Sequence, residues 1–182
     1  MGGIRLLAID PGPERSGYVV WESKVPIGLG RVVMCGHEDN SIVRGFINDQ
    51  QWSSVAIEMI ASYGMAVGAA VFNTCVEVGR FLERAKANKI DCKLVYRKDV
   101  KLFVCRSMKA KDGNIRQSLI DHLGPVGTKG NQGPLYGVKS HAWAALAIAV
   151  TAANDPRMPG YVGQTAPWQA GKGVTNEKGT SR

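Results

Sequence analysis

Two acidic residues stand at the ends of two apolar segments of the sequence. Asp10 follows the apolar residues 6–9 and precedes Pro11-Gly12, and Glu58 follows the apolar residues 55–57. A strand buried on both faces reads as a continuous apolar run, so we expect each carboxylate where a sheet meets solvent. Carboxylates placed in this way can share Mg²⁺ or Mn²⁺ ions that act on phosphodiesters. A structural turn aspartate with a salt-bridged glutamate is the alternative.

The composition favours one globular domain with a polyanionic partner. The chain has 182 residues, 45% of them apolar, and a formal net charge of +8. Clustered basic side chains gain affinity for phosphate backbones by releasing condensed counterions, which favours nucleic acid over a membrane surface. No apolar run approaches the roughly 20 residues that span a bilayer, and Met1 leads into a predicted strand instead of a signal-peptide core. We therefore expect a cytoplasmic protein.

The order of the predicted elements is that of an α/β domain with a mixed five-stranded sheet. Period-2 and buried apolar segments predict strands at residues 4–9, 17–21, 30–35, 55–58 and 92–96. Helical spacing predicts helices at residues 41–50, 65–87, 114–123 and 141–153. Ser140 is a plausible N-cap for the last helix, which follows a glycine-rich loop at 124–140. The domain then covers residues 1–156, and residues 157–182 are expected to be a disordered, basic tail.

The long helix predicted at 65–87 has two unusual properties. Its first part, residues 66–71, is small and apolar nearly all round, which suits either packing on the sheet or an interface between two subunits. Further along, an apolar stripe that includes Cys75 is expected to face the core, with Glu77 outside it. The four cysteines show no metal-site spacing, so we interpret them as buried free thiols: Cys35, Cys75, Cys92 and Cys105.

Three motifs together resemble those of the RuvC-type Holliday junction resolvases. They are Ala8-Ile9-Asp10-Pro11-Gly12 with Ser16-Gly17-Tyr18, then Val55-Ala56-Ile57-Glu58, then the apolar helix segment 145–151. Their order and spacing match across residues 4–153, and residues 134–138 further resemble the bacteriophage-encoded branch. The resemblance implies a ribonuclease H-like fold, a homodimer, and metal-dependent paired nicking of four-way DNA junctions during phage replication or packaging.

The resemblance also implies the catalytic residues, with one departure. Asp10, Glu58 and His141 match the family's metal and catalytic positions, and two ions per site are expected. The family's final helix carries a second metal-site residue three positions after the first, and Ala144 stands there in this sequence. Because an imidazole ligand suits Mn²⁺ better than Mg²⁺, activity is expected to favour Mn²⁺. Protonating the leaving oxygen or positioning a water is the alternative role for His141.

Basic residues crowd between the fifth strand and the next helix, and the resemblance implies that they line a DNA channel. Lys101 and Lys111 match the family's functional lysines best, and a solvated basic face is the alternative. The family also stacks an aromatic residue on an unpaired base; Ala61 occupies the strict position, so Tyr63 is our candidate. The predicted DNA-binding residues are Tyr63, Arg97, Lys98, Lys101, Arg106, Lys109, Lys111, Arg116, Lys129 and Lys139.

Two other functions remain open from the sequence. The missing carboxylate at Ala144 is also consistent with a protein of the same fold that binds junctions but cleaves them poorly. A ribonuclease H acting on RNA:DNA hybrids is the second alternative, because the strand-end acids would serve either substrate.

Overall fold

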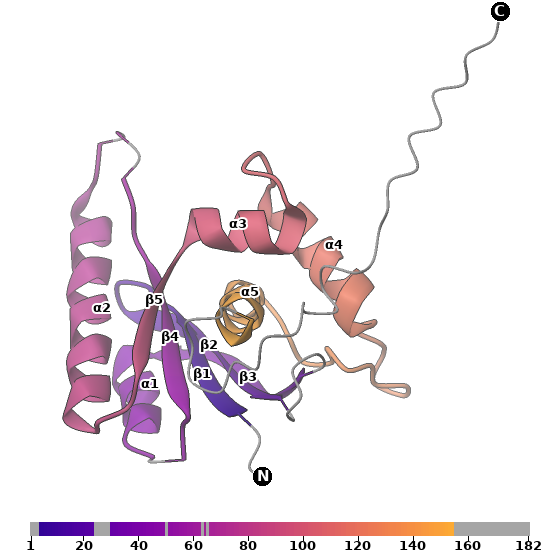
Figure 1. Ribbon diagram of the computed structural model, residues 1–182, viewed down its shortest axis with the longest axis horizontal. Helices are drawn as coiled ribbons and strands as arrows, with labels where there is room; N and C mark the ends of the chain where they lie inside the picture. Colours follow the sequence, from indigo (N-terminus) through magenta and orange to yellow (C-terminus); the bar gives the residue numbers. More distant parts are fainter. Residues whose placement is uncertain (1–3, 24–29, 50, 63, 65, 155–182) are drawn as a thin grey trace, which may run out of the picture.

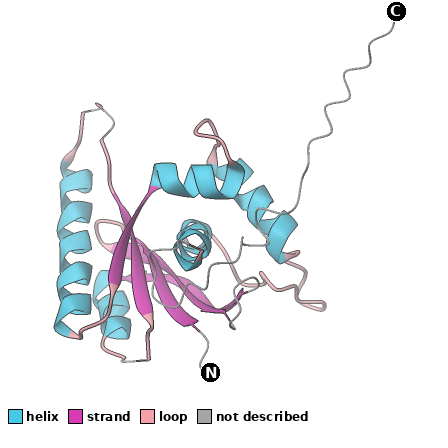
Figure 2. Ribbon diagram, in the orientation of Figure 1, coloured by secondary structure: helices cyan, strands magenta, loops and turns pink. Residues whose placement is uncertain are grey.

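Five strands form one mixed sheet in the order β3-β2-β1-β4-β5, as the ribbon diagrams show (Figures 1 and 2). The computed structural model describes residues 4–23, 30–49, 51–62, 64 and 66–154. The strands are β1 (Ile4–Asp10), β2 (Arg15–Ser23), β3 (Gly30–Asp39), β4 (Ser54–Met59) and β5 (Cys92–Tyr96). The predicted α/β architecture with a mixed five-stranded sheet is therefore confirmed.

The pairing of β1 with β4 brings the two acidic residues to one edge of the sheet. Strands β1, β2 and β3 pair antiparallel, whereas β1, β4 and β5 run parallel. Ile9 lies opposite Ile57, so Asp10 and Glu58 follow side by side at the carboxyl ends of two neighbouring strands. Carboxyl ends of parallel strands are where open α/β sheets form their sites.

Helices cover both faces of the sheet, with α1 and α2 on one side and α5 on the other (Figure 1). Alternate residues of β1 serve the two cores: Leu6 and Ala8 pack toward α5, and Leu7 and Ile9 pack toward α1 and α2. This alternation is the period of two that a strand buried on both faces requires. The helices are α1 (Asn40–Ile47), α2 (Ala69–Ala87), α3 (Arg97–Cys105), α4 (Asp112–Leu123) and α5 (Ala142–Ala153).

Helix α5 crosses the face of the sheet and is buried along nearly its whole length. In Figure 1 it is seen end-on, between the sheet and the pair α3 and α4. Its many alanines allow the helix axis to approach β1 and β2 closely, while Leu146 and Ile148 fill the space between them. The start of α5 is therefore rigidly placed beside the carboxyl end of β1.

Three helix predictions need correction. The long helix begins at Ala69 instead of residue 65, because Gly68 is extended at its N-cap. Helix α3 was not predicted. Its buried face consists of Val100 and Val104, and two apolar positions among basic residues are too few to indicate a helix. Ser140 is not the N-cap of α5: its φ is 45°, and His141 occupies the capping position.

The side-chain predictions for α2 were also partly wrong. Glu77 is buried and forms ion pairs with Arg44 of α1 and with Arg80. Cys75, predicted in the core, is exposed, and the other three cysteines are only partly buried, although all four thiols are free. The buried face of α2 runs through Thr74, Glu77, Val78, Phe81 and Ala85. Cys75 follows Thr74 and therefore lies about 100° around the helix from it, outside this face.

None of the helices in the described part of the chain is long and apolar enough to cross a membrane. The predicted tail at 157–182 and Tyr63 lie outside the described residues.

The Arg44–Glu77 pair should stabilise the packing of α1 on α2. Replacing Arg44 by alanine leaves a buried carboxylate with only the exposed Arg80 as partner, so we expect a loss of about 1–3 kcal/mol in the free energy of unfolding. Arg80→Ala is the matched control and should cost less than about 1 kcal/mol, because exposed ion pairs contribute little. Urea denaturation of the three proteins measures both values. Equal losses for the two variants would contradict a buried role for Arg44.

Candidate active site

A cavity of about 460 Å³ opens at the carboxyl ends of β1 and β4. Its walls come from the strand ends, from the first turns of α3 and α4, and from the start of α5. It is lined by Asp10, Glu58, Arg97, Asp112, Ile115, Arg116, Ser140, His141, Trp143 and Ala144. The structure thus brings together Asp10, Glu58 and His141, which come from three distant parts of the sequence.

Asp10 and Glu58 face each other at the floor of this cavity. Both side chains are largely buried, and Glu58 shares a hydrogen bond with Asp10. Burial, followed by the negative charge of Asp10, raises the pKa of Glu58 from its ordinary value of 4.5 to about 8, although the guanidinium of Arg97 opposes the shift. The negative charge of Asp10 disfavours ionisation of Glu58 beside it, and a bound cation would oppose this effect.

His141 reaches the same floor from the start of α5. Its Nδ1 lies 3.0 Å from Oδ2 of Asp10, within hydrogen-bond distance. This close approach depends on Gly17, which pairs with Asp10 across β1 and β2: a Cβ on residue 17 would lie 2.6 Å from the backbone oxygen of His141. The left-handed conformation of Ser140 turns the chain into α5 at this point.

His37, which the sequence analysis did not identify, contacts the ring of His141. The imidazole of His37, on β3, stacks on that of His141 with ring centroids 4.6 Å apart. Burial, together with the neighbouring His141 and Arg15, lowers the pKa of His37 below its ordinary value. His37 therefore tends to stay neutral and holds the His141 ring in place by stacking.

The turn after Asp10 is held by a small buried hydrogen-bond network. The hydroxyl of Ser16 donates to Oδ1 of Asn40 at 2.6 Å, and the amide of Asn40 donates to the carbonyl of Gly12 at 3.0 Å. Because Ser16 and Asn40 are buried, their hydrogen bonds are costly to leave unmade. The network fixes the backbone that carries Asp10.

Arginine side chains give the acidic floor a positive rim. A guanidinium nitrogen of Arg97 lies 3.6 Å from Oε1 of Glu58, and another contacts Asp112 at the start of α4. Arg116 lies over the ring of Trp143, 4.7 Å from its centroid. No sequence pattern predicts that Asp112 and Trp143 line the cavity, because they reach it only through the packing of α4 and α5.

The chemistry of the donor set suits a hard divalent cation. Within the described residues, no three His, Cys, Asp or Glu side chains are already gathered as a metal site. The carboxyl groups of Asp10 and Glu58 lie close together beside the His141 imidazole. Their oxygens and the His141 imidazole could hold an ion, whereas Ala144 presents only a methyl group to the same cavity.

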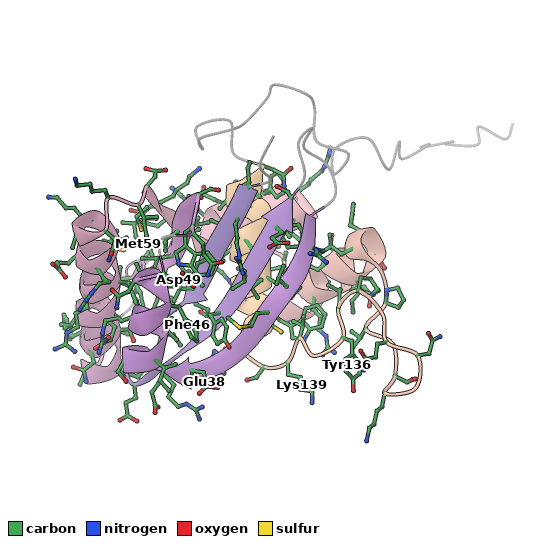
Figure 3. The ribbon with its side chains drawn as sticks, turned by 90° about the horizontal axis from the view of Figure 1, so that it is seen from below. Glu38, Phe46, Asp49, Met59, Tyr136 and Lys139 are labelled. Atoms are coloured by element: carbon green, nitrogen blue, oxygen red, sulfur yellow. The ribbon has the colours of Figure 1, made fainter. Side chains whose placement is uncertain are left out.

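The predicted DNA-binding residues lie mainly on α3, on α4 and on the loops between them. Arg97, Lys98 and Lys101 are grouped with Met108 around a second cavity on α3. Arg106 ends α3, and Lys109 and Lys111 follow it as exposed side chains, with Lys111 at the N-cap of α4. Lys129 and Lys139 are exposed on the glycine-rich loop, where Figure 3 shows Lys139 pointing away from the body of the protein.

Comparisons with known proteins give one clear result, which concerns the fold. Two solved structures of RuvC from Thermus thermophilus resemble the chain, one of them described as a complex with a Holliday junction substrate. The complex is 19% identical with a TM-score of 0.61, and the other is 21% identical with a TM-score of 0.59. Each alignment covers 82% of this chain and 93% of the other. The chain has the fold of RuvC. The ribonuclease H-like architecture predicted from the motifs is thereby confirmed.

Comparison of the whole sequence with known families and curated proteins finds no match. The RuvC fold is therefore recognisable in the structure, where the strand-end acids occupy neighbouring positions, more readily than in the overall sequence.

The raised pKa of Glu58 predicts a pH dependence for the metal-free protein. Between about pH 4.5 and pH 8, folded Glu58 keeps a proton that the unfolded chain releases, so the free energy of unfolding should fall as pH rises. Glu58→Gln removes this titrating group. The difference in free energy of unfolding between wild type and Glu58→Gln should therefore change by up to about 1.4 kcal/mol per pH unit within that window. Urea denaturation in a chelator at several pH values measures it. Parallel curves for the two proteins would show that Glu58 titrates normally.

Proposed function

We propose that the protein is a metal-dependent DNA endonuclease that resolves four-way and other branched DNA. The observation that carries this proposal is the buried Asp10–Glu58 pair beside His141, at the carboxyl ends of β1 and β4 of a RuvC-like fold. A carboxylate pair that favours an added positive charge, in a cavity with a basic rim, is suited to a divalent cation and a phosphodiester.

In this proposal Asp10, Glu58 and His141 hold two Mg²⁺ or Mn²⁺ ions, with Mn²⁺ preferred because of the imidazole. The bound ions would activate a water and stabilise the leaving oxygen of an in-line displacement. Asp10 lies next to both His141 and Glu58, so its carboxylate would contribute to holding the ions together with either group. His37 keeps the His141 ring oriented, and Arg97 balances the charge of Glu58 until a cation binds.

The basic residues of α3, α4 and the glycine-rich loop would grip the DNA backbone on either side of the cavity. Arg97 and Arg116 line the cavity itself, so they are placed for the phosphates nearest the cleaved bond. Lys111, Lys129 and Lys139 are exposed farther out and would contact the arms of the substrate. Contacts of this kind position the DNA without reading its sequence.

Paired nicking requires two sites, and we place the dimer contact on α2. Phe72 and Val76 lie one helical turn apart on α2 and are 60% and 54% exposed, the largest exposures among the large hydrophobic side chains of the described residues. Ala69 and Ala70 next to them are also exposed. Of the two interpretations left open for this small apolar segment, an interface between subunits is therefore the one that we propose. A second copy of the chain would bury this face.

A second candidate function rests on Ala144. Its methyl group lines the cavity at the position where the resemblance expects another metal-site residue. A protein with this site could bind branched DNA and cleave it slowly or not at all. A ribonuclease H of the same fold is the other alternative, and it would differ from both candidates in cutting RNA:DNA hybrids.

Asp10→Asn should abolish cleavage while leaving junction binding intact. The substitution removes a charge that holds the cations, so we expect a rate loss of about 100-fold or more in Mn²⁺ with an unchanged gel shift. A labelled four-way junction, an intact duplex and an RNA:DNA hybrid are incubated with the protein in Mn²⁺ and in Mg²⁺. Asp49→Asn is the control, because Asp49 follows α1 and is not among the residues that line the cavity.

The outcomes of this assay separate the candidates. Retained nicking by Asp10→Asn would exclude the proposed site. Shifted but uncut junction with the wild-type protein would favour the binding protein, and cleavage gained by Ala144→Asp would identify a disabled nuclease. Preferential cutting of the hybrid would favour a ribonuclease H.

Phe72→Asp should convert the dimer to a monomer. A carboxylate at the centre of an apolar interface has no partner, so association should weaken by 10-fold or more. Sedimentation velocity over a range of protein concentrations measures the change. Met34→Asp introduces the same charge on β3 and should leave the dimer intact. A wild-type protein that is monomeric at all concentrations would contradict the α2 interface.

A further inference from the structure

A third carboxylate, that of Asp112, lines the cavity that holds Asp10 and Glu58. Asp112 is the first residue of α4, and Ile115 and Arg116 line the same cavity three and four residues later. Residues at this spacing share one face of a helix, so this face of α4 is turned toward the site. Among the residues that line the cavity, only these three carry a carboxylate, and the metal site proposed above uses two of them.

The carboxylate of Asp112 is not used to cap the helix on which it lies. Helix α4 is capped by Asn114, whose Oδ1 accepts a hydrogen bond from the backbone N–H of Lys111 at 2.9 Å. An acidic residue in the first turn also gains from the helix dipole, but that gain does not require its side chain to face a cavity. The side chain of Asp112 instead contacts Arg97, which comes from α3.

Arg97 joins Asp112 to Glu58 through one guanidinium group. One terminal nitrogen of Arg97 lies 3.6 Å from Oε1 of Glu58, and the other contacts Oδ1 of Asp112. The two carboxylates therefore already share one cation, and that cation is a side chain. The side chain of Asp112 is 83% exposed. Because exposed ion pairs contribute little to stability, Asp112 can exchange this partner for another cation at little cost.

The remaining walls of the cavity give a reason for such an exchange. Ala144 lines it with a methyl group at the position where the resemblance expects a metal-site residue, so α5 contributes no carboxylate. Mg²⁺ and Mn²⁺ favour oxygen ligands. Two divalent cations also carry more charge than the carboxylates of Asp10 and Glu58 neutralise, and a third carboxylate reduces that excess.

We propose that Asp112 is a further ligand of the metal site and supplies from α4 the carboxylate that Ala144 does not offer on α5. Metal binding then displaces the guanidinium of Arg97 from between Glu58 and Asp112. The displaced guanidinium still lines the cavity, where it can contact a phosphate of the substrate. The inference rests on the proposed function, because it concerns the same metal site.

The test measures the binding of Mn²⁺ without DNA, from the loss of the electron paramagnetic resonance signal of free Mn²⁺ as protein is added. Asp112→Asn removes the charge of the proposed ligand and keeps the size of its side chain. Asp121→Asn is the matched control, because it removes the same charge from an exposed position near the end of α4 that does not line the cavity. Arg97→Gln removes the competing guanidinium. Thermal unfolding in a chelator verifies that each variant is folded.

Asp112→Asn should weaken the binding of Mn²⁺ by about 10-fold or more, whereas Asp121→Asn should bind it as wild type does. Arg97→Gln should bind Mn²⁺ more tightly than wild type, because no guanidinium then competes for Glu58 and Asp112. In the Arg97→Gln background, Asp112→Asn should again weaken the binding. This double variant separates a ligand from a residue that acts only by holding Arg97.

Three results would contradict the inference. Equal Mn²⁺ affinities of wild type and Asp112→Asn would overturn the role of Asp112 and leave the proposed site of Asp10, Glu58 and His141 intact. An effect of Asp112→Asn that disappears in the Arg97→Gln background would show that Asp112 only holds Arg97. A wild-type protein that binds no Mn²⁺ would overturn the metal site as a whole, and with it the proposed function.

Discussion

The mutual repulsion of Asp10 and Glu58 is the constraint on which the arrangement of this site depends. Parallel pairing of β1 and β4 places the two carboxylates together, and burial under α5 removes much of the water that would screen them. Burial first and the negative charge of Asp10 second disfavour the ionised form of Glu58, and together they raise its pKa to about 8. Arg97 approaches Glu58 and His141 approaches Asp10, whereas Asp112 adds a third carboxylate to the cavity wall and contacts Arg97.

Holding two such acids together requires a rigid backbone, and several features of the fold supply it. Helix α5 is packed closely on β1 and β2 through its alanines, so its first residue cannot move away from Asp10. Gly17 leaves room for His141, and the buried Ser16–Asn40 network fixes the turn that follows Asp10. The stability lost in gathering like charges is recovered in the two apolar cores on either side of the sheet.

The distribution of charge around the cavity would suit the nucleic-acid substrate that we propose. The two carboxylates lie deep, whereas arginine and lysine side chains of α3, α4 and the glycine-rich loop form the surroundings. A phosphate backbone can therefore approach a positive rim before it meets the negative floor.

The sequence by itself determined the fold class and indicated Asp10 and Glu58, whereas His141 was added by the resemblance to the resolvases. Buried strands produce unbroken apolar runs, so Asp10 and Glu58 were visible as the acids that end them, and the mixed sheet followed from the order of the elements. Only the tertiary structure decided what surrounds them. Asp112 and Trp143 reach the cavity from α4 and α5, and His37 on β3 stacks on His141. No local pattern marks a contact between residues so far apart in the chain. Helix α3 and the burial of Glu77 were likewise hidden, because a charged residue reads as exposed until its partner, here Arg44 on another helix, is brought beside it.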